Sequence, residues 1–131
     1  MLPFPIALRP GLPIAEQVVF AVKKAVVSGQ LKPGDPFPSV RQISQELQIN
    51  PNTAQRVAAT LVAEGVLVTT PAVGSFVAPR AAADRRERAE LLGTELERLV
   101  VEAKQLGLSL DEVQDGLAAH WRRLGGRKEP L

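Results

Sequence analysis

Apolar residues in the first half of the chain recur at helical spacing between frequent prolines and glycines. From Ile14 to Ser28 they return every three or four residues, with Glu16 in the first turn and Gly29 just after the end. An acidic first turn, one apolar stripe and a terminal glycine are typical of an amphipathic helix. The pattern therefore predicts a first helix over residues 14–28.

Two further helices follow, separated by a tight turn. A capping-box pattern at Ser39 precedes a short apolar stripe, which predicts a helix over residues 40–47. Asn50 followed by Pro51 is typical of a helix start, because proline lacks the N–H group that would be unpaired there. The third helix has its own apolar face and closes at Gly65.

Two β-prone runs follow the third helix. Residues 66–70 and 75–77 are rich in β-branched and aromatic side chains, and a proline and a glycine lie between them, which predicts a β-hairpin. Three helices followed by a hairpin describe a winged helix-turn-helix, whose helix after the turn enters the DNA major groove. The predicted fold class is therefore mostly α with a small β-hairpin.

The pattern changes after Pro79, where a long charged helix with a leucine seam begins. Gly107 ends this helix, and a capping box at Ser109 starts another that continues through Trp121. The two helices are predicted to form an αα-hairpin. We therefore expect a winged helix-turn-helix domain over residues 1–80 and a helical dimerisation region over residues 81–131.

The leucine seam predicts a dimer interface. The seam consists of Leu92, Leu96, Leu99, Ala103 and Leu106, which are spaced four, three, four and three residues apart. This is the spacing of a heptad repeat sustained for about two repeats. The alternative is that the seam packs only against the second helix of its own hairpin. The predicted interface comprises Leu92, Leu96, Leu99, Ala103, Leu106, Val113, Leu117 and Trp121.

Composition and charge narrow the function classes. The 131 residues carry a formal charge of +2, are 45% hydrophobic and include no cysteine, so disulfides and thiolate metal sites are excluded. Residues 1–80 hold seven cations against four acids, whereas residues 81–131 hold nine against ten. The basic bias of the first part is compatible with a polyanionic partner.

The sequence offers little for catalysis. It has one histidine, no tyrosine and no phosphate-cradling glycine loop. We expect no enzyme activity, no cofactor and no metal, and interpret His120 as solvated because a metal site needs several convergent ligands. No apolar run is long enough to cross a bilayer and no signal peptide is recognisable, so we expect a cytoplasmic protein without membrane contact.

The outward face of the third helix carries the candidate DNA contacts. Amides suit adenine and arginine suits guanine or phosphate, and the helix start is expected to direct free N–H groups at a phosphate. The alternative is that this polar face is simply a solvated surface without a binding partner. The candidates are Asn50, Asn52, Thr53, Gln55 and Arg56, with Arg41 on the preceding helix.

Short motifs from Pro13 to Val77 resemble the DNA-binding domain of GntR-type bacterial transcription regulators. The short appendage and the Asn50-to-Thr53 run are similar to the YtrA subgroup, whose C-terminal part is two helices used for dimerisation. The motifs are Gly29-x-Leu31-x-Pro33-Gly34-Asp35, Pro38-Ser39-Val40-Arg41, Glu64-Gly65 and Gly74-Ser75-Phe76-Val77.

The resemblance implies a repressor that binds a pseudo-palindromic operator in double-stranded DNA as a homodimer. It places Arg41 and the outward face of the third helix on DNA, and adds Gly74 and Ser75 in the wing. The chain departs from the family at the wing tip, where Ala72-Val73-Gly74 replaces two glycines that often flank a basic residue. Phe37 replaces a usual leucine, which we interpret as a packing change.

Three questions stay open at this stage. The winged helix is alternatively a protein-interaction module or a non-specific DNA-binding protein. A small-molecule effector is unassigned, although Leu91, Leu99, Val100 and Trp121 are candidates to line a pocket between the helices of a dimer. The charged run 84–88 alternates bases with acids, which pair along one helix or lie near DNA flanking the operator.

Overall fold

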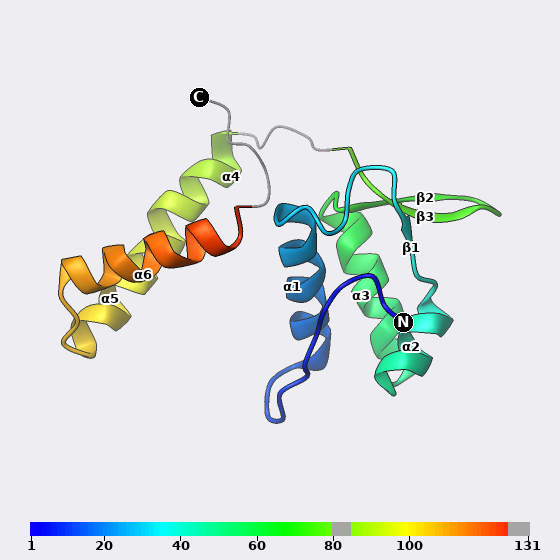
Figure 1. Ribbon diagram of the computed structural model, residues 1–131, viewed down its shortest axis with the longest axis horizontal. Helices are drawn as coiled ribbons and strands as arrows, with labels where there is room; N and C mark the ends of the chain where they lie inside the picture. Colours follow the sequence, from blue (N-terminus) through cyan, green and yellow to red (C-terminus); the bar gives the residue numbers. More distant parts are fainter. Residues whose placement is uncertain (80–84, 126–131) are drawn as a thin grey trace. The chain divides into compact units, whose positions relative to one another are not determined.

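The computed structural model describes residues 1–79 and 85–125, which divide into a winged unit (residues 1–79) and a helical unit (residues 85–124) (Figure 1). The winged unit contains α1 (Ile14–Val27), β1 (Pro36–Phe37), α2 (Val40–Leu47), α3 (Pro51–Ala63), β2 (Leu67–Thr70) and β3 (Gly74–Val77). The helical unit contains α4 (Arg85–Glu90), the π-helical turn η1 (Leu91–Glu95), α5 (Leu96–Gln105) and α6 (Leu110–Arg123).

The helices of the winged unit begin and end close to the predicted positions. At the start of α2, the Ser39 hydroxyl accepts a hydrogen bond from the backbone N–H of Gln42 at 3.1 Å. The helix then ends at Gln48, whose left-handed φ of 54° turns the chain toward α3. The Ser44 hydroxyl donates to the Ile49 carbonyl at 2.8 Å, which fixes this turn. The predicted helix-turn-helix is confirmed.

The wing is a three-stranded antiparallel sheet in the order β1-β3-β2. The predicted hairpin of β2 and β3 is confirmed, but β1, in which Pro36 pairs with Phe76 and Phe37 with Ser75, was not predicted. A two-residue strand beside prolines shows no alternation of apolar and polar residues, and proline is tolerated because β1 lies at the sheet edge. The mostly α fold class with a small sheet is confirmed.

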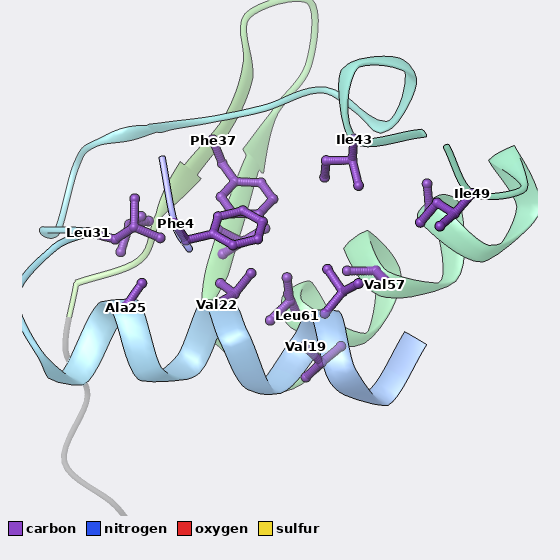
Figure 2. Packing of buried hydrophobic residues seen from close by; sticks show 14 residues of the cluster. Phe4, Val19, Val22, Ala25, Leu31, Phe37, Ile43, Ile49, Val57 and Leu61 are labelled. Carbon is purple, nitrogen blue, oxygen red and sulfur yellow. The ribbon is translucent and has the colours of Figure 1, made fainter. Parts of the chain in front are cut away.

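The core lies where α1, α2, α3, the sheet and the N-terminal segment meet. Phe37 is buried and its ring stacks on Phe4, with centroids 5.9 Å apart. The replacement of the family's leucine by Phe37 is thus a packing change, as expected. Figure 2 shows the two rings on the side of α1 that carries Val22. The core comprises Phe4, Val18, Val19, Val22, Ala25, Leu31, Phe37, Ile43, Ile49, Ala54, Val57, Leu61, Leu67 and Val77.

The N-terminal segment is tied to α1 by one side chain. The Gln17 amide accepts from the Arg9 backbone N–H at 2.7 Å and donates to the carbonyls of Arg9 and Leu12 at 3.0 and 3.1 Å. These bonds fix residues 9–12 beside the start of α1, and Phe4, earlier in the same segment, is buried in the core. A structural role for this segment was not predicted.

The helical unit follows the predicted outline with one difference. Residues 85–105 are helical throughout, but the α-helical geometry changes to a π-helical turn at η1. This turn, which includes Gly93, was not predicted. The second helix, α6, begins with the predicted capping box of Ser109 and Glu112. Among the described residues, no helix is both long and apolar enough to span a membrane.

The wing turn allows a stability prediction. Ala72 has a left-handed φ of 66°, a conformation that costs a residue with a Cβ about 1–2 kcal/mol and costs glycine little. Ala72→Gly is therefore expected to raise the free energy of unfolding by about 1 kcal/mol, measured by urea denaturation. The matched control, Ala59→Gly on the exposed face inside α3, is expected to lower it by about 1 kcal/mol. An equal loss in both variants contradicts the prediction.

Candidate nucleic-acid interface

The inner face of α3 determines which side chains face outward. Ala54, Val57 and Leu61 are completely buried against the rest of the core. Helical spacing then turns Asn52, Gln55 and Arg56 to the opposite side, where all three are exposed, and leaves Thr53 half-buried. The predicted orientation of the α3 face is thus present in the structure.

The first turn of α3 differs from the expectation of free N–H groups. Pro51 has no N–H, and the Asn50 side-chain oxygen accepts from the Asn52 N–H at 2.7 Å. The Asn50 carbonyl accepts from Thr53 and Ala54 at 2.9 and 3.1 Å. The expectation that this turn presents unpaired N–H groups to a phosphate is therefore wrong. Asn50 keeps only its exposed amide NH₂ group as a donor toward DNA.

The cations beside α3 are available for binding. Arg41, the second residue of α2, is exposed, and α2 packs against α3. In the part of the chain that the structure describes, the side chains of Arg41, Gln55 and Arg56 form no hydrogen bond or ion pair. Their polar groups are hydrated in the free protein and can exchange water for a ligand without breaking internal contacts.

The nearby acids are engaged elsewhere. Glu46 of α2 pairs with the amino group of Met1, and Glu64 after α3 pairs with Lys23 of α1. Asp35 accepts the backbone N–H of Lys32 at 2.9 Å. Pairing Glu46 and Glu64 with cations reduces the negative charge near α2 and α3, which favours a polyanion at Arg41 and Arg56.

The wing has no charge of its own. Residues 66–79 contain no Lys, Arg, Asp or Glu, and the exposed tip residue Val73 is apolar. The hydroxyls of Thr69 and Ser75 lie 3.1 Å apart and share a hydrogen bond. Gly74 is exposed, and Ser75 is half-buried. Any wing contact with DNA therefore relies on hydroxyl and backbone groups.

The helical unit leaves most of its apolar side chains exposed. Among its described residues only Ala103 is buried, at 6% exposure, whereas Leu92, Leu106 and Trp121 are 68%, 77% and 63% exposed. The exposed part of the predicted interface is Leu92, Leu96, Leu99, Leu106, Leu117 and Trp121.

Two predicted interface residues differ from the others. Ala103 is buried within its own unit, and Val113 is half-buried. The assignment of Ala103 to a dimer interface stays a prediction. Val101 and Leu110, which are 51% and 70% exposed, were not among the predicted interface residues. They lie outside the heptad seam that guided the selection.

The histidine has an ordinary surface environment. His120 is exposed, and its Nδ1 atom contacts the guanidinium of Arg123. No group of three or more His, Asp or Glu side chains within the described ranges is arranged to hold a metal ion.

Comparison with known proteins gives the family. Residues 14–77, which run from the start of α1 to the end of β3, match the model of the gntR family of bacterial regulatory proteins. The chain is also 33% identical over 106 residues to the HTH-type regulator YhcF of Bacillus subtilis, covering 81% of this chain and 84% of that protein. The chain belongs to the GntR family.

The similarity to YtrA extends beyond the winged unit. The HTH-type transcriptional repressor YtrA of Bacillus subtilis is 29% identical over 108 residues, covering 82% of this chain and 83% of that protein. The YtrA-type identification is therefore confirmed. Relatives of this kind are transcriptional regulators, which agrees with the prediction that the chain is not an enzyme.

Solved structures share the fold. A protein from Listeria monocytogenes EGD-e, described as a transcriptional antiterminator, has a TM-score of 0.84 at 26% identity, covering 98% of this chain and 96% of that chain. YtrA from Sulfolobus acidocaldarius, a GntR-family transcription factor, has a TM-score of 0.52 at 25% identity, covering 91% and 97%. This protein is thus a DNA-binding transcriptional regulator of the GntR family.

Proposed function

We propose that this GntR-family regulator is a cytoplasmic repressor that binds a pseudo-palindromic operator as a homodimer. Residues 1–80 bind DNA and residues 81–131 dimerise. The observation that carries the proposal is the outward face of α3, where Asn52, Gln55 and Arg56 are exposed on a helix fixed by its buried opposite side.

The chemistry of this face suits base recognition in the major groove. The amides of Asn52 and Gln55 can each donate and accept at the edge of an adenine. The guanidiniums of Arg56 and Arg41 suit a guanine or a phosphate. Smaller contacts to the DNA backbone are assigned to Asn50, Thr53, Gly74 and Ser75.

The helical unit supports dimerisation because it lacks a core of its own. Several leucines and Trp121 are exposed around α5 and α6. Among the described residues of the helical unit, Ala103 alone is buried. Exposed apolar side chains in such number are unfavourable in water and typical of protein interfaces. A second copy brings identical surfaces together around a two-fold axis and removes them from water.

A symmetric dimer presents two α3 helices to DNA. Half-sites in successive major grooves then lie about 34–36 Å apart or a multiple of this distance. A protein held across two turns of a promoter obstructs the polymerase, and the similar protein YtrA of Bacillus subtilis is described as a repressor. These points favour repression.

Truncating Gln55 tests recognition by α3. Gln55→Ala is expected to reduce discrimination between the operator and an unrelated duplex by about 1–3 kcal/mol, or about 5- to 150-fold, because one bidentate base contact is lost. Fluorescence anisotropy on both duplexes measures this. The matched control is Gln114→Ala, which removes an exposed amide from α6 and is expected to leave both affinities unchanged.

The same titration separates the alternative functions. Equal binding of the unmodified protein to every duplex indicates a non-specific DNA-binding protein. No binding at low salt by the folded protein indicates a protein-interaction module. Unchanged discrimination in Gln55→Ala contradicts recognition by this side of α3.

Charging the apolar surface of the helical unit tests dimerisation. Leu99→Asp places a carboxylate on an exposed part of α5, and burying it in the interface is costly. Light scattering at micromolar concentration is expected to change from dimer to monomer. Val73→Asp is the control, because it charges an apolar residue of the wing tip.

The chain carries one tryptophan, which provides an independent readout. Trp121 lies in the proposed interface, so its emission is expected to shift to longer wavelength when Leu99→Asp separates the subunits. A monomeric unmodified protein, or a dimeric Leu99→Asp variant, contradicts the proposed interface.

A further inference from the structure

The helical unit is strongly polarised in charge along its length. One end of the unit carries five arginines and two acids, Glu87 and Glu90. The arginines are Arg85, Arg86 and Arg88 of α4 and Arg122 and Arg123 of α6. Over the rest of the unit, residues 91–121, two cations are outnumbered by six acids. We call the five arginines the basic end.

Chain direction places the two parts of the basic end at the same end of the helical unit. After the turn between α5 and α6, α6 runs back toward the end of the unit at which α4 begins (Figure 1). Arg122 and Arg123 lie in the last turn of α6, and the other three arginines lie in α4. All five are exposed.

These arginines are not neutralised by neighbouring acids. Asp84, the first acid of the charged run 84–88, lies outside the described residues. Arg85, Arg86, Arg88 and Arg122 form no ion pair or hydrogen bond within the described ranges. Arg123 contacts His120, which is not an acid. The basic end therefore holds unpaired positive charge in water.

The described winged unit carries six cations, of which Arg9, Lys32, Arg41 and Arg56 are exposed and form no ion pair with the described residues. The wing is uncharged from residue 66 to residue 79. Lys23 is paired with Glu64, and Lys24 lies over the Phe20 ring at 5.8 Å. Arg41 and Arg56 are the free cations of α2 and α3.

We propose that the basic end is a second DNA-binding surface, which contacts backbone phosphates outside the bases that α3 reads. This inference rests on the proposed function, since it needs a protein seated on DNA. Arginine guanidiniums bind phosphate oxygens regardless of sequence. The surface adds affinity and salt dependence, while base discrimination remains with α3.

The test measures the salt dependence of binding to two duplexes, one ending at the half-sites and one extended by about a helical turn on each side. The full-length variant Arg85→Gln/Arg86→Gln/Arg88→Gln is compared with the unmodified protein between 50 and 200 mM salt. On the extended duplex, the slope of log K against log salt is expected to fall by up to about 5.4 when the three arginines of both subunits are lost, which changes the affinity ratio of the two proteins by up to about 1,800-fold over this range. On the short duplex the two proteins are expected to bind alike.

Matched charge changes control for net charge. Arg122→Gln/Arg123→Gln removes two cations from the basic end of each subunit and is expected to lower the slope by up to about 3.6. Arg98→Gln/Lys104→Gln removes two cations from the acid-rich part of the same unit and is expected to leave it unchanged. If the triple variant in α4 fails to fold or dimerise, the double variant Arg122→Gln/Arg123→Gln in α6 still tests the basic end. Hydroxyl-radical footprinting is expected to show protection of the sugars beside the flanking phosphates, and both basic-end variants are expected to lose it.

The outcomes separate this inference from the proposed function. Specific binding with equal slopes and footprints in all variants overturns the basic end and leaves α3 recognition intact. An equal fall in slope for the control pair also overturns it, because only net charge then matters. Absence of specific binding by the unmodified protein overturns both proposals.

Discussion

Burial of one side of α3 is the constraint on which the recognition surface depends. Ala54, Val57 and Leu61 are completely buried, so rotating α3 about its axis exposes apolar surface and leaves a void in the core. Because a helix places residues three and four apart on one side, fixing these three also fixes Asn52, Gln55 and Arg56. The orientation of the DNA-facing amides is therefore a consequence of hydrophobic packing.

The same packing connects distant parts of the chain to the wing. Phe4 stacks on Phe37, and Phe37 belongs to β1, which pairs with β3. The N-terminal segment thus supports the edge strand of the sheet from inside. Because the wing carries no charge, we propose that positive charge comes from arginines on α2, α3 and the helical unit instead.

Local patterns predicted the elements that depend on local interactions. The caps at Ser39 and Ser109, the helix start at Asn50 and Pro51, and the hairpin were recognisable because each involves residues close in sequence. The outward face of α3 followed from its apolar period. The residues proposed to contact DNA were thus found from the sequence, and their contacts stay a prediction.

Features that depend on distant partners or exact geometry were not predictable. β1 forms because β3, nearly forty residues later, offers it a partner, and Phe4 is buried only because Phe37 reaches it. The residues at the start of α3 were recognised as a helix start. Whether the backbone N–H groups there are hydrogen-bonded depends on the position of the Asn50 side chain, which the sequence does not give. The interruption at η1 and the burial of Ala103 likewise depend on how the helical unit packs.

Selection of bound duplexes from a random DNA library is a direct test of base recognition by a symmetric dimer. We expect enrichment of one sequence with two-fold symmetry, whose half-sites are separated by about one helical turn or a multiple of it. Enrichment of a single unpaired half-site contradicts the symmetric dimer. Failure to enrich any sequence contradicts base recognition by α3.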